Sequence, residues 1–219
     1  MADRRAIRAK TSAAVVDDVL EQLFSGTLKS GDRIDQDQLG NSLGISRLPV
    51  REALVVLERD GIVSMKYHRG VFVEPFDAES ILDDFEIMGL LSGVAVRRLA
   101  ANYVPETIEL LEGLLDDLRA TRPSDKNRIF EIVSQMMITE HRAGGSRRLR
   151  AQLRSQAGFL PHAFRFIDRS HVDTVTAHAL VLDAVVAGDG ERAAAYRLED
   201  FRDAGRSVVR ELRRRGVIG

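Results

Sequence analysis

Apolar residues recur with helical spacing in three short segments near the start of the chain. The first segment has an apolar stripe at i, i+3, i+4 and i+7, formed by Val16, Val19, Leu20 and Leu23. Thr11 or Ser12 can cap the beginning of this helix, and Gly26 favours its end. The spacing therefore predicts an amphipathic helix that ends near Gly26.

The second segment is shorter and has a signal at each end. Asp35, with Gln38 three residues later, forms a capping-box pattern, which favours the start of a helix. Leu39 and Leu43 follow on one face, and Gly44 suits the left-handed conformation that ends many helices. We expect a short helix between Asp35 and Gly44.

The third segment begins two residues later. Ser46 is a good N-cap residue, and Pro49 falls in the first turn, where a missing N–H costs little. The apolar stripe consists of Val50, Ala53, Leu54 and Leu57. Gly61 favours the end of this helix, so the second and third segments together predict a helix-turn-helix.

A β-hairpin is predicted directly after the third helix. Ile62-Val63 and Val71-Phe72-Val73 are rich in β-branched residues and flank the polar segment 64–70. A hairpin that follows three such helices is typical of a winged helix-turn-helix. We therefore expect residues 1–75 to form a winged helix-turn-helix domain with a small β-wing.

Beyond Pro75 all strong signals are helical. Stripes at helical spacing are formed by Ile108, Leu111, Leu115 and Leu118 and by Val175, Leu182 and Val186. Gly144-Gly145 marks the expected end of one helix. We expect six or seven helices in residues 76–219, which can bury their stripes only as a bundle. The predicted fold class is mainly α, with an all-helical second domain.

Composition narrows the class of protein. Apolar residues make up 44% and charged residues 30% of the 219 residues, which is an ordinary balance for a globular protein. No apolar run reaches the roughly 18 residues that a membrane-spanning helix needs. The first residues lead into no signal-peptide core. We therefore expect a cytoplasmic protein with no membrane partner.

Charge and cysteine content restrict the possible sites. The net charge of −1 argues against a diffuse polybasic binder of nucleic acid, but it allows a short basic face. The absence of cysteine excludes disulfides, thiolate zinc sites and cysteine nucleophiles. Any metal ion would have to be bound by His, carboxylate or amide side chains.

Arg47 and Arg51 form such a basic face. They lie four residues apart at the start of the third helix, so they project together, away from the apolar stripe. Two guanidinium groups placed in this way can reach guanine O6 and N7 when the helix lies in the major groove. Ser46 can bind a phosphate through its hydroxyl and the neighbouring N–H groups.

The wing and the second helix add further candidate contacts to DNA. His68-Arg69-Gly70 at the wing tip combines a cation with a residue that lets the backbone approach closely. Gln36 and Gln38, near the start of the second helix, are candidate phosphate contacts.

The alternative for the arginine pair is an ordinary solvated helix face. In that case the two arginines would be tied to acidic neighbours such as Glu52 or Glu58. A winged helix that binds protein is a further alternative. The ordered series of helices, serine cap, arginine pair and wing favours DNA binding over both.

Two long motifs, residues 44–54 and 57–63, resemble those of the N-terminal domain of GntR-family bacterial transcription regulators. The resemblance extends over residues 13–73. It implies DNA contacts by Ser46, Arg47 and Arg51 and by the wing around Arg69-Gly70. It also implies a homodimer on a pseudo-palindromic operator in double-stranded DNA, which is consistent with a monomer too small to contact a whole site.

Residues 77–215 resemble the all-helical FCD domain of the FadR subfamily. Phe85-Glu86, Leu99-Ala100-Ala101 and the stretch from His178 to Ala193 carry this resemblance. It implies a divalent metal ion held by an Asp or Asn and three His, beside a carboxylate-type effector.

The metal-ligand pattern of that family is altered in this chain. His178 matches one ligand His, and Asp200 falls where another His is expected. For the preceding pair, one register gives Asn127 and Glu131 and the other gives Glu131 and Gln135. Such an oxygen-rich set would suit Mn, Mg or Zn. The alternative is that His178 is a core imidazole bonded to Asp200 or Glu131, with no metal.

The effector residues implied by the resemblance also differ. Met88 stands where the family has an effector-binding Arg, and Ser92 stands where it has a Glu. These replacements make a carboxylate effector less expected and the pocket more apolar.

Together these features predict a regulator whose operator binding is controlled by a small-molecule effector in the helical domain. The family resemblance alone implies a repressor. One alternative is a metal-dependent helical-bundle enzyme with Glu131 as its base. No Gly-rich phosphate loop, Gly-x-Ser-x-Gly or His-Glu-x-x-His is present, so we expect no enzyme. The other alternative, an architectural DNA-binding protein without effector, leaves the second domain without a task.

Overall fold

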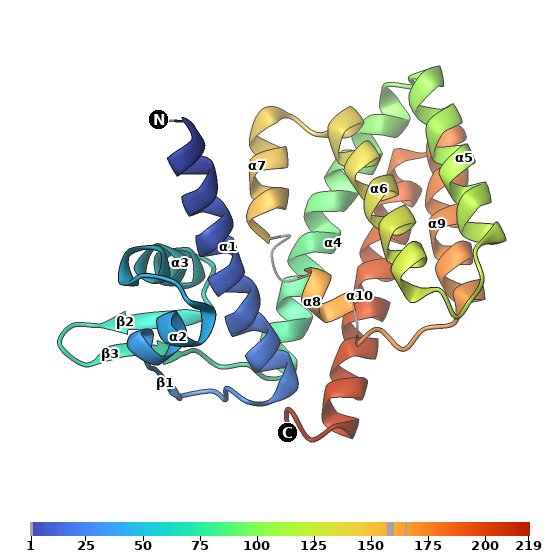
Figure 1. The fold of residues 1–219 in the computed structure, drawn as a ribbon. Helices are drawn as coiled ribbons and strands as arrows, with labels where there is room; N and C mark the ends of the chain where they lie inside the picture. Colours follow the sequence, from blue (N-terminus) through green and yellow to red (C-terminus); the bar gives the residue numbers. More distant parts are fainter. Residues whose placement is uncertain (1, 157–159, 165) are drawn as a thin grey trace. The chain divides into compact units, whose positions relative to one another are not determined.

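The computed structural model in Figure 1 describes residues 2–156, 160–164 and 166–219. Contacts divide the chain into two units. The first comprises the residues up to Ile81 together with Leu212–Gly219, and the second comprises Leu82–Glu211.

The first unit contains the predicted helix-turn-helix and wing. Its elements are α1 (Ala2–Ser25), β1 (Arg33–Ile34), α2 (Gln36–Leu43), α3 (Arg47–Arg59), β2 (Val63–Lys66) and β3 (Gly70–Val73). α1 begins at Ala2, so the predicted start at Thr11 or Ser12 is wrong. Residues 2–10 contain neither Gly nor Pro, and nothing in this stretch interrupts the helix.

The wing is a three-stranded antiparallel sheet in the order β1-β3-β2. In the predicted hairpin, Val63 pairs with Val73 and Lys66 pairs with Gly70. β1 was not predicted, because a strand of two residues is too short to show an alternating pattern.

The ends of α2 follow the sequence signals. The Asp35 side chain accepts hydrogen bonds from the backbone N–H groups of Asp37 and Gln38. These bonds, first that from Gln38, lower the pKa of Asp35, because they favour its charged form. Gly44 ends the helix at φ +64°.

An apolar core fixes α3 against the rest of the first unit. α1 packs on α3, and the stripe of α3 is buried together with that of α1. The buried stripe of α3 contains Val50, Ala53, Leu54 and Leu57, as predicted. Since this face is buried, the opposite face of α3 is left to solvent.

The second unit is a helical bundle. Its helices are α4 (Ala78–Ala101), α5 (Pro105–Ala120), α6 (Lys126–Gly144), α7 (Arg147–Gln156), α8 (Leu160–Phe164), α9 (His171–Val186) and α10 (Gly190–Arg214). The described residues thus contain seven helices beyond the wing, in agreement with the prediction of six or seven. Among these residues, no helix is both long and apolar enough to cross a membrane.

The core of this bundle joins the predicted stripes. α5 packs on both α6 and α9, and the stripe of α5 is buried with apolar residues of α4, α6 and α9 (Figure 1). The core includes Ile108, Leu111, Leu115, Leu118, Ile132, Met136 and Leu182.

Replacing Gly44 by Ala should lower the free energy of unfolding of the first unit by about 1–2 kcal/mol, because a Cβ is disfavoured in the left-handed conformation. Nothing lies within 4 Å of the added Cβ, so backbone strain is the only cost. Gly113→Ala, in the exposed middle of α5, is the matched control and should stabilise by about 0.5–1 kcal/mol. Urea unfolding measures the free energy of unfolding of both variants. A change of the same sign in the two variants would contradict the prediction.

Candidate DNA-binding face and helical-domain pocket

The start of α3 exposes the residues predicted to contact DNA. Ser46 occupies the N-cap position in an extended conformation, but its side chain makes no capping hydrogen bond. Its hydroxyl therefore remains available to another acceptor or donor. Arg47 and Arg51 are both exposed, while Pro49 and Val50 between them are buried.

Arg47 forms an ion pair with α2. Its Nε and Nη2 donate to the two carboxylate oxygens of Asp37 at 2.7 and 2.8 Å. This pair is largely exposed, with 80% of the Arg47 side chain accessible. Arg47 is thus tied to an acidic residue, as the alternative of a solvated helix face expected, but the partner is Asp37, while Glu58 accepts from the backbone N–H of Met65. Arg51 makes no ion pair within the described residues.

A polar hollow brings several predicted residues together. It has a volume of about 720 Å³ and is lined by Arg33, Ile34, Asp35, Gln36, Asp37, Arg47, Arg51 and Gly70. Arg33 adds a third guanidinium that the sequence analysis missed, because it lies on the unpredicted strand β1. Gln38, Ser46, His68 and Arg69 do not line this hollow.

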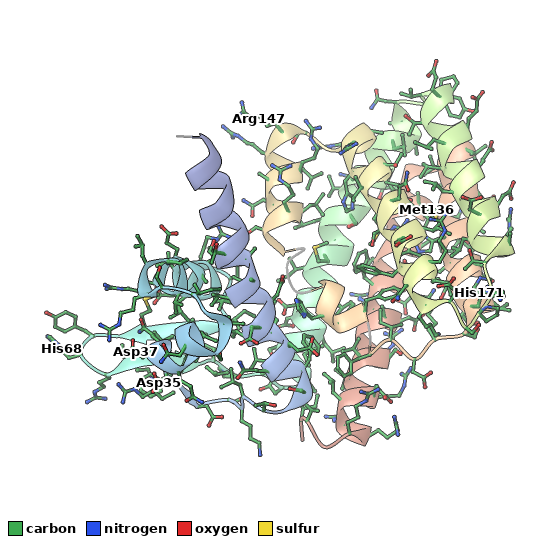
Figure 2. All side chains as sticks on the ribbon, viewed as in Figure 1. Asp35, Asp37, His68, Met136, Arg147 and His171 are labelled. Atoms are coloured by element: carbon green, nitrogen blue, oxygen red, sulfur yellow. The ribbon has the colours of Figure 1, made fainter. Side chains whose placement is uncertain are left out.

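The wing carries its candidate residues at its tip. Figure 2 shows His68 at the end of the β2–β3 loop and Asp35 and Asp37 on the neighbouring α2 segment. His68 adopts φ +54°, and Gly70 adopts φ +109°. A Cβ on Gly70 would lie 2.8 Å from Nε of Arg33, so glycine allows the wing to approach that guanidinium. Arg69 is exposed beside them.

Two exposed apolar side chains on this face were also missed. Leu48 is 54% exposed between Arg47 and Pro49, and Tyr67 is 88% exposed on the wing loop. An exposed aliphatic side chain at the start of such a helix can contact a thymine methyl group. A large apolar residue outside the stripe is the sequence signal that could have singled out Leu48.

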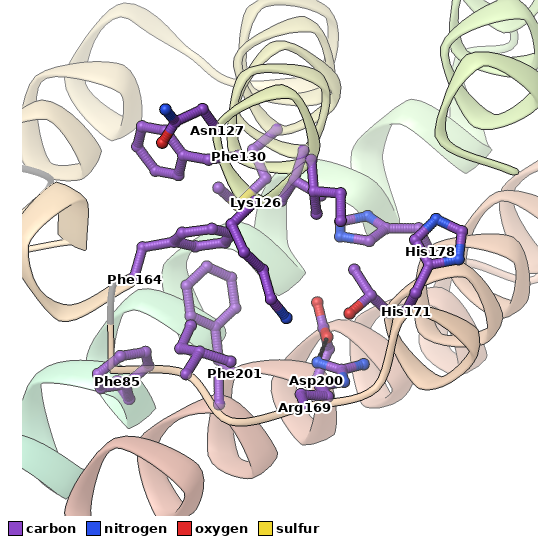
Figure 3. A pocket seen from close by; sticks show the side chains of 16 residues that line it. Phe85, Lys126, Asn127, Phe130, Phe164, Arg169, His171, His178, Asp200 and Phe201 are labelled. Carbon is purple, nitrogen blue, oxygen red and sulfur yellow. Dashed lines mark hydrogen bonds and ion pairs between the residues drawn. The ribbon is translucent and has the colours of Figure 1, made fainter. Parts of the chain in front are cut away.

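The second unit contains a pocket of about 360 Å³. Figure 3 shows the phenyl rings of Phe85, Phe164 and Phe201 on one side of this pocket and His178, Asp200 and Arg169 on the other. The pocket therefore combines an aromatic part with a polar end.

The polar end contacts a buried ion pair whose two members do not themselves line the pocket. Arg197 on α10 is 0% exposed, and its Nη2 donates to both carboxylate oxygens of Glu140 on α6, at 2.6 and 2.7 Å. Its Nη1 donates to Oδ2 of Asp200 at 2.9 Å. Oδ1 of Asp200 accepts from Arg169 at 2.7 Å. Two guanidinium groups and two carboxylates thus balance in charge.

His178 on α9 is held neutral beside this pair. Its Nδ1 lies 3.4 Å from Nη1 of Arg197. Since a guanidinium can only donate, Nδ1 must accept and the ring proton must lie on Nε2. Burial lowers the pKa of His178 to about 4, and the charge of Arg197 acts in the same direction.

Only part of the predicted metal-ligand set comes together. His178, Asp200 and Asn127 all line the pocket. Glu131 is exposed and pairs with Arg128 at 3.3 Å, and Gln135 is exposed on the same face of α6. Among the described residues, no three His, Asp or Glu side chains are arranged to hold a metal ion. Glu131, which both predicted registers of α6 share, is exposed and so lies away from this pocket, while Asn127 of the first register lines it.

Glu140 and Arg197 are the residues that sequence reasoning missed. Each continues an apolar stripe at helical spacing, since Glu140 lies four residues after the buried Met136 and Arg197 lies four residues after the buried Ala193. A charged residue at a stripe position, with an opposite charge at a stripe position of another helix, is the signal that could have found them.

The predicted effector residues lie at a second hollow. Met88 lines a hollow of about 440 Å³ together with His141, Phe130 and several arginines of α6 and α7. Ser92 is buried, and its Oγ lies 3.0 Å from Nε2 of His141. Neither residue lines the pocket that contains His178.

Two family models match the chain. Residues 11–73 match the bacterial regulatory proteins of the gntR family, and residues 83–202 match the FCD domain. The matched family is one of regulatory proteins, which agrees with the prediction of a regulator and not an enzyme.

Curated relatives give the same indication. An uncharacterized HTH-type transcriptional regulator of Mycobacterium tuberculosis is 41% identical over 156 residues, which are 71% of this chain and 63% of that protein. The match therefore spans less than two thirds of that relative. The "Probable D-xylose utilization operon transcriptional repressor" of Paenarthrobacter nicotinovorans is 26% identical over 198 residues, covering 87% of this chain and 85% of that protein.

Solved structures share the fold. The structure of E. coli McbR/YncC has a TM-score of 0.61 at 22% identity and covers 87% of this chain and 93% of its own. Lar of Listeria monocytogenes has a TM-score of 0.63 at 17% identity, covering 91% and 96%. At these identities the likeness concerns the fold alone.

Replacing Glu140 by Ala should lower the free energy of unfolding by about 3–5 kcal/mol, because the charge of Arg197 would stay buried without its bidentate partner. The matched control is Glu131→Ala on the same helix, which breaks an exposed pair and should cost less than about 1 kcal/mol. Urea denaturation measures both values. Similar losses in the two variants would show that the buried pair does not dominate.

Proposed function

Because the chain belongs to the GntR family of bacterial regulatory proteins and carries an FCD domain, we propose that it binds an operator through its first unit and a small-molecule effector in its second. The observation that carries the first part is the arginine pair exposed at the start of α3. The apolar stripe of α3 is buried, so the exposed face with Arg47 and Arg51 is the one that can enter a major groove.

Around α3, the proposed contacts to DNA divide into contacts to base edges and contacts to phosphates. Arg51 is without an ion pair in the described residues and is suited to a guanine edge. The free hydroxyl of Ser46 is suited to a phosphate, as are Gln36, Gln38 and the wing around Arg69. Arg33 extends the basic surface from α3 to the wing.

We infer a homodimer on a pseudo-palindromic operator, because one short helix and its wing can contact only a half-site. Action as a repressor is supported by the Paenarthrobacter relative, whose name describes a repressor.

The effector site is assigned to the pocket that contains His178. A pocket with an aromatic wall and a few polar groups at one end is the usual form of a small-molecule site. A purely architectural DNA-binding protein would have no use for it. The effector would bind one arrangement of the dimer more tightly than another and so shift the spacing of the two α3 helices.

Replacing Arg51 by Ala should weaken operator binding by about 1–3 kcal/mol and relax the base preference at one position of each half-site. DNA selected from a random library by the wild-type protein supplies the operator, and gel-shift titration gives the affinities. Arg119→Ala, which removes an exposed guanidinium of α5, is the control and should leave the affinity unchanged. Equal operator affinity of wild type and Arg51→Ala would refute the assignment.

Ala204 tests the effector pocket. It is 8% exposed and lines the pocket from α10, so Ala204→Leu should fill part of the space while leaving operator binding intact. A thermal-shift screen of metabolites on wild-type protein identifies the effector, since a ligand of the folded state raises apparent stability. The thermal shift with that metabolite should then be lost in Ala204→Leu and kept in Ala187→Leu, an exposed site. A full response in Ala204→Leu would place the effector elsewhere.

A further inference from the structure

Two residues at the polar end of the pocket, His178 and Asp200, contact a buried cation that belongs to the chain itself. Arg197 is fully buried and contacts Glu140 from α6, His178 from α9 and Asp200 from its own helix. An imidazole and two carboxylates are ligand types that bind divalent metal ions. The donor types of a metal site are therefore present, but they surround a guanidinium.

The donor atoms are already engaged. Each oxygen of Glu140 and each oxygen of Asp200 accepts an N–H bond, three from contacts with Arg197 and one from Arg169. The Nδ1 lone pair of His178 faces Arg197. A metal ion at Nδ1 would collide with that guanidinium.

Coordination through the other nitrogen of His178 is disfavoured as well. A metal ion at Nε2 requires that the ring proton move to Nδ1. There it would point at the N–H groups of Arg197, 3.4 Å away, and neither group could accept. Arg197 thus fixes the tautomer that cannot ligate a metal from the pocket side.

The balance of charges around Arg197 also disfavours a metal ion. Arg197 and Arg169 carry two positive charges, and Glu140 and Asp200 carry two negative charges. A divalent ion placed among them would have no uncompensated carboxylate and would be repelled by a buried guanidinium. The residues present do not fit a metal ion.

We propose that Arg197 takes the place of a divalent metal ion in this helical domain. The internal guanidinium holds Glu140, His178 and Asp200 in position and organises the polar end of the pocket without any metal. The effector is then recognised by side chains alone, through groups such as the Nε2–H of His178 and the ammonium of Lys126, which also lines the pocket.

The first test uses the full wild-type chain, purified without a chelator and freed of any affinity tag. Elemental analysis should find far less than one metal ion per chain. Titration with Zn²⁺ or Mn²⁺ alone should leave the melting temperature unchanged, and so should EDTA. One bound metal ion per chain that is lost in His178→Ala would overturn the proposal.

The second test removes the guanidinium. Arg197→Ala frees one nitrogen ligand and two carboxylates around an empty space, so the variant should bind Zn²⁺ or Mn²⁺, and the metal should raise its melting temperature. Arg197→Ala with His178→Ala is the matched control and should lose this response. Arg197→Lys keeps a positive charge and should gain no metal binding.

The outcomes are separable from those of the proposed function, because the metal titrations measure neither operator nor effector binding. Equal metal responses in Arg197→Ala and in the double variant would show that these donors do not form a latent site and would refute the proposal. If Arg197→Ala does not fold alone, its refolding in the presence of Zn²⁺ gives the same comparison. The wild-type titration decides the metal question in either case.

Discussion

The second unit depends on the burial of one guanidinium group. Moving a charged group out of water costs several kcal/mol unless good partners replace the lost hydration. Arg197 obtains these partners from three helices: Glu140 on α6, His178 on α9, and Asp200 on α10 itself. Any shift of α6 or α9 along α10 would separate the charges. The ion pair therefore fixes the mutual register of these helices more strictly than apolar contacts can, since apolar contacts tolerate sliding.

The first unit differs from the second in where its charged groups lie. Its core is apolar, and Arg33, Arg47 and Arg51 lie at its surface, where a charged side chain keeps its hydration. The buried stripe of α3 fixes which face is exposed, and the short strand β1 brings Arg33 to the same hollow as Arg47 and Arg51. This hollow has three arginines beside Asp35 and Asp37, so a small local excess of positive charge coexists with the near-zero net charge of the chain.

The sequence was sufficient for elements whose signals are local. The caps at Asp35 and Gly44 and the stripe of α3 depend on residues within a few positions, so the helix-turn-helix and its exposed arginines followed from spacing alone. The pairing of Arg197 with Glu140 joins residues 57 positions apart on different helices. Helical periodicity shows that a residue faces inward but not which side chain it meets. Glu131 was predicted from the register of the family resemblance, and it faces solvent.

The exposed pair between Arg47 and Asp37 bears on how strongly the first unit binds DNA of unrelated sequence. A guanidinium already bound to a carboxylate neutralises a phosphate less well and so releases fewer of the cations condensed on DNA, and the carboxylate itself repels the phosphate backbone. Asp37 thus acts as an intramolecular competitor for Arg47. Only a partner that replaces both hydrogen bonds, as a guanine edge does, can displace it at little cost. Sequence discrimination would then arise from an acidic residue that never touches a base, by making the wrong sites less attractive.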